Sequence, residues 1–229
     1  MWYVHYLVNG FVGLLVALGS AYICEIWILG RERRSKRLYL FSSVVGICFG
    51  ILCAFEFTQT SISLLTIFFG FVLFMGATID MKYLILPDEG AILILISGLV
   101  RLWLLEESIV GAIIEVIMLL MVGCLLWGLS KQSFGLGDVK WLAASMCWVP
   151  IHLLWLVLYI SFVSGTLFVV LRYGYKKLGL FTGRLTIDVQ KQESTKNKQL
   201  PFAPFLCSAI FLVYLWGEWI SGWYTRNFL

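Results

Sequence analysis

Long apolar runs follow one another along almost the whole chain, and short polar breaks separate them. A helix that crosses a bilayer needs roughly 20 mostly apolar residues, and most of these runs have about that length. The pattern predicts an all-α polytopic membrane protein with about eight transmembrane helices. The predicted spans cover residues 7–29, 38–55, 62–80, 89–105, 109–129, 138–148, 150–172 and 202–222. The sixth is the shortest, because it ends at Val149-Pro150.

The composition agrees with this pattern. Of the 229 residues, 61% are apolar and only 13% are charged, so the bilayer is the expected solvent. We expect one integral membrane domain over residues 1–229, because no stretch is polar enough to form a separate soluble domain with its own core. The first apolar run begins near Leu7 without a basic region or a small-residue cleavage site, so we expect a retained helix and not a signal peptide.

The charges predict the orientation. Two of the breaks are strongly basic, a short loop at 30–37 and a longer one at 173–199. The positive-inside rule puts both in the cytoplasm and the N-terminus outside, which leaves only Arg101 and Arg226 on the outer side. A seven-span alternative, with residues 138–172 as one bent unit, would force the second loop outside. Topology explains the basic loops, so we expect no nucleic-acid partner.

The cysteines do not predict a metal site. All six lie inside apolar runs and no two form a C-x-x-C pair, so we expect neither a zinc cluster nor a disulfide framework. In such runs cysteine behaves as a small hydrophobic residue.

Two aspartates need a functional explanation, because charges within or beside spans are costly. Asp80 closes the third predicted span and Asp138 opens the sixth, both at the cytoplasmic end, so the two carboxylates share one membrane depth. Two carboxyls within about 3–4 Å share a proton, which leaves one base to activate water and one acid to protonate the amide. We therefore predict aspartyl peptide hydrolysis with Asp80 and Asp138 as catalytic residues.

Neighbouring residues fit this reading or a structural one. Gly135 and Gly137 permit close backbone approach, φ above zero and an extended substrate strand alongside. Alternatively, Asp138 is an N-cap and the glycines form its turn. Asp80 stands at the C-terminal end of its helix, where the dipole disfavours a carboxylate, so capping does not account for it.

A second polar group surrounds Pro87 and Asp88. Pro87 ends the preceding segment, and Asp88 is well placed to cap the fourth span. Lys140 follows Asp138 by two residues. It either steers the leaving peptide and tunes Asp138, or snorkels to the interface.

Three blocks resemble the type IV prepilin peptidases, bacterial membrane aspartyl proteases with a G-x-G-D signature. Ile79-Asp80 through Pro87-Asp88 is similar to the family's I-D-x₆-P-D block, and residues 135–143 are similar to its G-x-G-D-V-K-L-x-A block. Residues 200–206, with Pro201, Phe202 and Pro204, are similar to the I-P-F-G-P-F-L segment before the last helix. The three blocks have the family's order and spacing, and the similarity spans about residues 60–210.

The resemblance implies a leader peptidase of the bacterial inner membrane. Asp80 and Asp138 match the family's catalytic positions. Gly135, Gly137, Lys140, Pro87 and Asp88 match supporting ones, and Pro201, Phe202 and Pro204 a substrate-side loop. The implied partners are type IV pilin-like precursors, whose short basic leader is cut at the cytoplasmic face, and membrane lipids.

One departure concerns the cofactor. Many relatives carry a larger cytoplasmic insert after the first span, often with two C-x-x-C pairs, and also methylate the new N-terminus. Here the insert is reduced to residues 30–37 without cysteine, and Gly19-Ser20 lacks the asparagine of the family's G-S-F-x-N segment. We therefore expect a peptidase without S-adenosylmethionine binding or methylation.

Besides a non-catalytic membrane scaffold, which would leave Asp80 unexplained, two rival functions remain. One is a related protease that acts on another membrane substrate, such as a preflagellin or a signal peptide remnant. The other is a transporter that uses membrane carboxylates to carry protons or cations, although such sites are expected near the bilayer midplane.

Overall fold

The computed structural model describes residues 6–15, 18, 51–53, 56–57, 59–129, 135–177 and 201–228. The basic loop at 30–37 and most of the predicted first span, of the predicted second span and of the loop at 173–199 lie outside these described residues.

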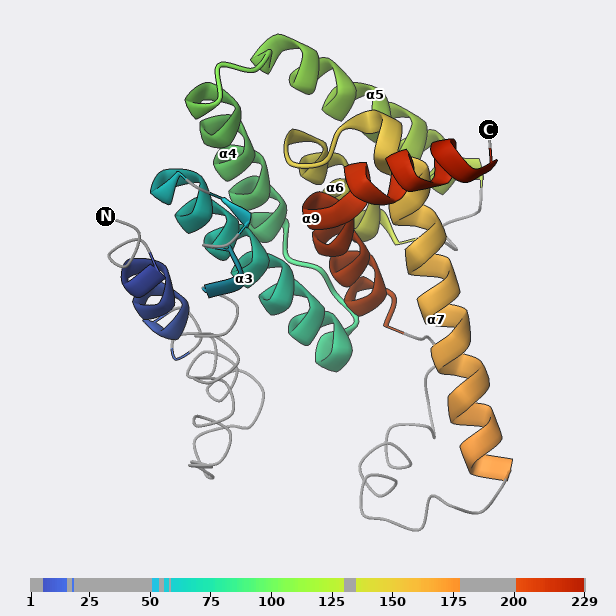
Figure 1. The fold of residues 1–229 in the computed structure, drawn as a ribbon. Coiled ribbons are helices and arrows are strands. Elements are labelled where there is room, and N and C mark those ends of the chain that lie inside the picture. The colour runs from blue at the N-terminus through green and yellow to red at the C-terminus, as the bar shows by residue number, and fades with distance from the viewer. Residues whose placement is uncertain are drawn as a thin grey trace.

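The described part of the chain is all helical and contains no strand, which confirms the predicted class (Figure 1). Four of its helices, α3, α5, α7 and α9, are long and apolar enough to cross a membrane. The elements are a helix at Tyr6–Leu15, α3 (Thr60–Tyr83), α4 (Asp88–Leu104), α5 (Ile109–Leu129), α6 (Leu136–Ala144), η2 (Ser145–Cys147), η3 (Ile151–Leu153), α7 (Leu154–Lys177) and α9 (Ala203–Phe228).

The predicted sixth span, 138–148, is a short helix. With nine residues, α6 is only about 14 Å long, roughly half the thickness of the hydrocarbon core. The chain then tightens into the 3-10 turn η2 and stops before Pro150, because a residue that precedes proline avoids helical geometry. The total of eight spans stays a prediction.

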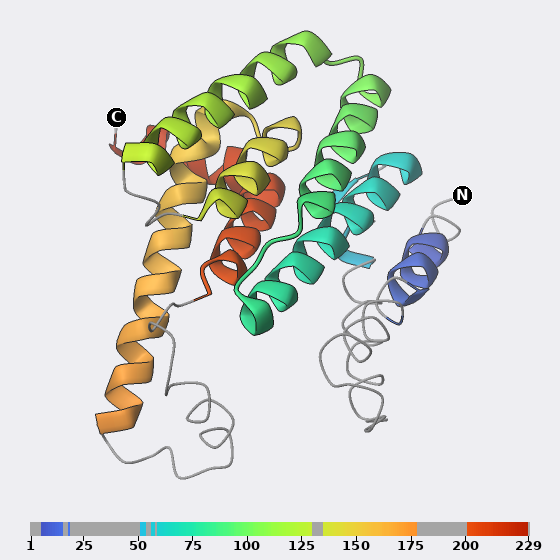
Figure 2. The ribbon, with the colours of Figure 1, turned by 180° about the vertical axis from the view of Figure 1, so that it is seen from behind.

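Two contacts show the relative direction of α3 and α9. Asp80, at the end of α3, contacts Ala203 at the start of α9, and Thr66, near the start of α3, hydrogen-bonds with Tyr214 farther along α9 at 3.1 Å. These two helices are therefore antiparallel, and they lie side by side in both views (Figures 1 and 2). The end of α3 and the start of α9 thus meet on one side of the protein.

Two tryptophans fix α6 alongside α4. Trp141 donates its indole N–H to the carbonyl of Pro87 at 3.0 Å, and Trp148 donates to the carbonyl of Ile94 at 3.1 Å. The two donors and the two acceptors are each seven residues apart, so the segments run parallel. The starts of α4 and α6 therefore join the end of α3 at the same side of the protein.

The core surrounds α6. Five of its nine residues are buried, as expected for a helix that is enclosed by others. The ring of Trp148 stacks on Phe69 with centroids 4.2 Å apart, and Tyr214 meets both rings edge-on. By contrast, only 11% of the most apolar part of α5 is buried, so α5 presents its apolar side chains outward, as a lipid-facing helix does.

Candidate active site

Asp80 lies in the last turn of α3 and is only 8% exposed. Its Oδ2 accepts a hydrogen bond of 3.0 Å from the backbone N–H of Ala203, the first residue of α9. The helix α3 ends just beyond it, where Leu84 adopts a left-handed conformation with φ 56° and donates its N–H to the carbonyl of Asp80.

The hydrogen bond to Ala203 corrects one step of the sequence argument. Asp80 does not cap its own helix, α3, but it does cap the start of a different helix, α9. The carboxylate stands at the N-terminus of α9, where unpaired N–H groups and the helix dipole favour a negative charge. The buried position of Asp80 is therefore no evidence of catalysis by itself, and a functional reading depends on what else lies beside it.

Asp138 is the third residue of α6. The residue that caps α6 is Gly135, with φ −69° and ψ 121°, and no side chain makes the capping hydrogen bond. The alternative in which Asp138 is the N-cap is therefore wrong. A Cβ on Gly135 would lie 2.7 Å from Oδ2 of Asp138 and would displace this carboxylate, so the glycine leaves space for the side chain and does not serve a positive φ.

The two carboxylates lie close enough to interact. Asp138 is outside the four candidate spans, and burial raises the pKa of its carboxyl from 3.8 to about 6, with the negative charge of Asp80 as the second cause. Cys207 is buried one turn into α9, and its thiol interacts electrostatically with both aspartates. The end of α3, the start of α6 and the first turns of α9 thus build one acidic site.

Gly137 has a different neighbour from the one predicted. It belongs to the first turn of α6, and a Cβ there would lie 3.0 Å from the Cβ of Leu86 in the α3–α4 connection. The expectation of an extended substrate strand along Gly135–Gly137 is therefore wrong at Gly137, because that segment is already helical and is packed against the chain's own loop.

Asp88 and Lys140 are joined to each other. Lys140 Nζ contacts both carboxylate oxygens of Asp88 at 2.7 and 2.8 Å, in a half-exposed ion pair that links the starts of α4 and α6. The N-cap of α4 is Pro87, so the predicted capping role of Asp88 is wrong, although its first-turn position still suits the helix dipole. The Pro87 carbonyl accepts the Trp141 N–H, so Pro87 also supports α6.

The predicted substrate-side loop forms the start of α9. The carbonyl of Phe202 accepts hydrogen bonds from the N–H groups of Phe205 and Leu206 and so opens the helix, and Pro204 occupies its first turn, where proline is well tolerated. Pro201 and Phe202 are partly buried. Their contact with substrate stays a prediction, but the segment has a second effect: it places the Ala203 N–H on Asp80.

Sequence reasoning missed two residues at this site. Ala203 acts through its backbone, which no residue-type argument detects, although it lies inside a recognised block. Trp141 is buried where α6 meets α3, the two helices that carry the aspartates. In the sequence it is visible only as a large aromatic residue three positions after Asp138.

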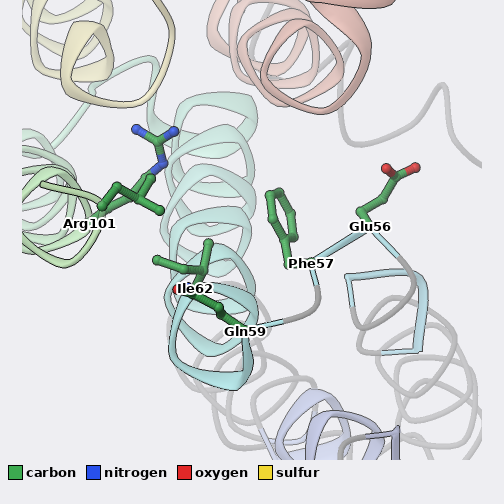
Figure 3. Close-up of a pocket in the computed structure, with 6 residues that line it drawn as sticks. Glu56, Phe57, Gln59, Ile62 and Arg101 are labelled. Atoms are coloured by element: carbon green, nitrogen blue, oxygen red, sulfur yellow. The ribbon is translucent and has the colours of Figure 1, made fainter. Parts of the chain in front are cut away.

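A second polar region lies at the opposite end of α3. A cavity of about 270 Å³ is lined by Glu56, Phe57, Gln59, Ile62, Arg101 and Leu105 (Figure 3). Arg101 stands over the rings of Trp148 and Tyr214, at 6.0 and 5.6 Å from their centroids. Gln59 precedes α3 and Asp80 ends it, so this cavity is about 30 Å from the acidic site along the helix and does not belong to it.

The site holds no histidine and no metal cluster among the described residues. His152 contacts Glu218 at 3.1 Å at the far end of the bundle, and no group of three or more histidine, cysteine, aspartate or glutamate side chains gathers in the described ranges. The titratable groups that the structure brings together at the acidic site are the carboxyls of Asp80 and Asp138 and the thiol of Cys207.

A bundle of apolar helices with a carboxylate pair at one end defines a multi-pass membrane protein with an acid–base site. Residues 67–170 match the model of the type IV leader peptidase family. That segment contains both aspartates, and the resemblance to this family seen in the sequence is confirmed.

Curated relatives extend the match over most of the chain. The prepilin leader peptidase/N-methyltransferase of Aeromonas hydrophila is 27% identical over 221 residues, which cover 89% of this chain and 68% of the relative. The protein of the same name from Aeromonas salmonicida is 26% identical over 217 residues, with the same coverage. That of Stutzerimonas stutzeri is 27% identical over 199 residues, 84% of this chain and 63% of the relative. No solved structure gives a significant match.

Proposed function

We propose that this protein is a prepilin leader peptidase, an aspartic endopeptidase of the bacterial inner membrane whose acidic site faces the cytoplasm. The observation that carries the proposal is the acidic site itself, in which buried Asp80 and half-buried Asp138 interact within the segment that matches the leader peptidase family. The substrates are type IV prepilins, whose apolar helix stays in the bilayer while the basic leader reaches the site.

The reaction needs one proton on the pair. The ionised carboxylate takes a proton from water, and the water oxygen attacks the scissile carbonyl carbon while the protonated carboxyl donates to the carbonyl oxygen. The carboxyl that was protonated by water then donates to the amide nitrogen. The C–N bond breaks as the other carboxylate takes back a proton from a hydroxyl of the tetrahedral intermediate. The products are the free leader with a new carboxylate and the mature pilin with a new amine, and the pair again shares one proton.

The roles of the other residues follow from their contacts. Ala203 orients Asp80 through its N–H, and Gly135 leaves room for the carboxylate of Asp138. Lys140 and Asp88 join the starts of α4 and α6, and Pro201, Phe202 and Pro204 line the approach of the leader at the start of α9. The family match favours this reading over a transporter, and the names of the relatives favour prepilins over preflagellins or signal peptides.

We further propose that this protein neither binds S-adenosylmethionine nor methylates its product. The support is the short loop at 30–37, which has no cysteine. Mass spectrometry of the mature pilin decides this point, since methylation adds a methyl group to the new N-terminus. A free amine is expected, and a methylated one would contradict the proposal.

Co-expression with a type IV prepilin tests the peptidase. The wild-type protein is expected to remove the leader, whereas Asp80→Asn and Asp138→Asn are expected to accumulate at normal level and to leave the prepilin uncut. Glu115→Gln, a carboxyl-to-amide change at the opposite end of the bundle, is the matched control and should retain cleavage. Cleavage by both aspartate variants would overturn the mechanism.

A further inference from the structure

Trp141 fills a socket made by two glycines on two different helices. Its six-membered ring lies directly over Gly76 of α3 and Gly90 of α4, and a Cβ at either glycine would overlap the ring. The side chain is only 1% exposed, and its N–H is held by the Pro87 carbonyl. One side chain of α6 thus contacts α3, α4 and the loop between them.

The helical register relates this socket to the aspartates. Asp138 precedes Trp141 by three residues on α6, and Asp80 follows Gly76 by four residues on α3. Residues three or four apart lie on the same face of a helix, so the Trp141–Gly76 contact lies one turn below the two carboxylates. The distance at which the ring holds α6 from α3 therefore sets the distance between Asp80 and Asp138.

We propose that Trp141 is a positioning residue, whose ring, seated on Gly76 and Gly90, sets the separation of the two aspartates. The predicted effect of Trp141 on kcat rests on the proposed function, whereas its predicted effect on the separation of the carboxylates does not. Trp141 touches no reacting atom. Its action passes through the spacing of α3 and α6.

The same helices supply a matched structural control. Trp148 is also 1% exposed, donates its N–H to a carbonyl of α4 and packs against a glycine, Gly98. A Cβ added to Gly98 would overlap the Cβ of Cys147 and would lie 3.0 Å from the indole Nε1. Trp148 lies seven residues farther from the aspartates. A residue that merely fills the core would respond to substitution in the same way at both places.

The experiment compares Gly76→Ala and Trp141→Phe with Gly98→Ala and Trp148→Phe. The added methyl of Gly76→Ala displaces the ring, and Trp141→Phe shortens it and removes the N–H donor. Both are expected to lower kcat for prepilin cleavage about 10- to 100-fold, as small displacements of catalytic groups do, with KM unchanged within about threefold. Adding Trp141→Leu to Gly76→Ala restores the space and is expected to recover part of the lost kcat.

A second measurement does not need substrate. The infrared band of the protonated Asp138 carboxyl, identified by its loss in Asp138→Asn, is titrated with pH in each variant. The added methyl of Gly76→Ala separates the carboxylates and weakens the repulsion by Asp80, so the midpoint is expected to move to lower pH. The shorter ring of Trp141→Phe lets α6 approach α3, so the midpoint is expected to move to higher pH in that variant. It is expected to stay unchanged in Gly98→Ala and Trp148→Phe, although these variants lose thermal stability to a similar degree.

The two measurements separate the possible failures. A wild-type protein that cuts no prepilin would overturn the proposed function, while the infrared midpoints would still decide the role of Trp141. Midpoints that move equally at both tryptophans, or at neither, would overturn the positioning role. If Gly76→Ala does not accumulate, the comparison of Trp141→Phe with Trp148→Phe decides the question.

Discussion

Replacement of Asp138 by asparagine is expected to stabilise the protein at alkaline pH while it abolishes activity. Burial and the charge of Asp80 raise the pKa of Asp138 from 3.8 to about 6, so the folded protein holds this proton more tightly than the unfolded chain does. The stability that the proton contributes is present in full below the unfolded pKa of 3.8, and it is lost as the pH rises through the folded value of about 6.

The magnitude follows from the two pKa values. The difference between 3.8 and about 6 corresponds to about 3 kcal/mol in the free energy of unfolding, an order-of-magnitude value, since one pKa unit is worth about 1.4 kcal/mol. The amide of asparagine resembles the protonated carboxyl and does not ionise. Asp138→Asn is therefore expected to equal the wild type in stability near pH 4 and to exceed it above pH 7.

The assay is thermal unfolding in detergent at a series of pH values. The difference in apparent Tm between Asp138→Asn and wild type should grow to several degrees as the pH rises from 4 to 8, because 1 kcal/mol shifts the Tm of a soluble domain of this size by about 2–4 °C. Glu89→Gln, which replaces an exposed carboxylate at the same end of the protein, serves as the control and should give a flat difference. If the Tm difference between Asp138→Asn and wild type stays constant or falls as the pH rises, the conclusion that burial and repulsion by Asp80 raise the pKa of Asp138 is refuted.

Three further substitutions test individual contacts. Gly135→Ala places a methyl 2.7 Å from Oδ2 of Asp138 and is expected to lower kcat for prepilin cleavage tenfold or more, on the order expected for a displaced catalytic group. The control is Gly174→Ala, whose methyl meets open space. A kcat of Gly135→Ala within twofold of that of the control would contradict this prediction. Lys140→Met breaks a half-exposed ion pair and should change stability by no more than about 1 kcal/mol, so a much larger loss of Tm would show that the pair matters more than its exposure implies. Ala203→Pro removes the N–H that binds Asp80, and the first position of a helix accepts proline. The substitution should lower the free energy of unfolding by about 1.5–3 kcal/mol, which is measured as a lower Tm at pH 8.

The sequence predicts the long helices well, because their signal is local. The predicted span at 109–129 coincides with α5, whose apolar run begins just after Ser108, and this serine caps the helix by accepting the Gly111 N–H at 3.2 Å. The predicted span at 138–148 is wrong in form, since α6 is short. An apolar run next to a proline does not reveal whether the chain stays α-helical or tightens into a 3-10 turn.

The site is predicted in part. The shared depth of Asp80 and Asp138 follows from topology and spacing alone, and the structure brings the two residues within interaction range. The partners of the polar residues do not follow, because they depend on contacts between helices. Asp80 binds the start of α9, 123 residues away in sequence, and Asp88 binds Lys140, 52 residues away. Local rules of helix capping predicted Asp88 as a cap and offered the same role as an alternative for Asp138, because they consider only one helix at a time.

The most direct test of the aspartate pair is the single-turnover rate of leader cleavage by purified protein with a purified type IV prepilin. Asp80→Asn and Asp138→Asn are each expected to lower this rate by a factor of about 1,000 or more, and the double variant should be no slower than either single one, because residues that act as a unit do not add their effects. Each variant should retain the thermal unfolding transition, so that the loss reports chemistry and not folding. A rate within tenfold of the wild type in either folded variant would contradict catalysis by Asp80 and Asp138.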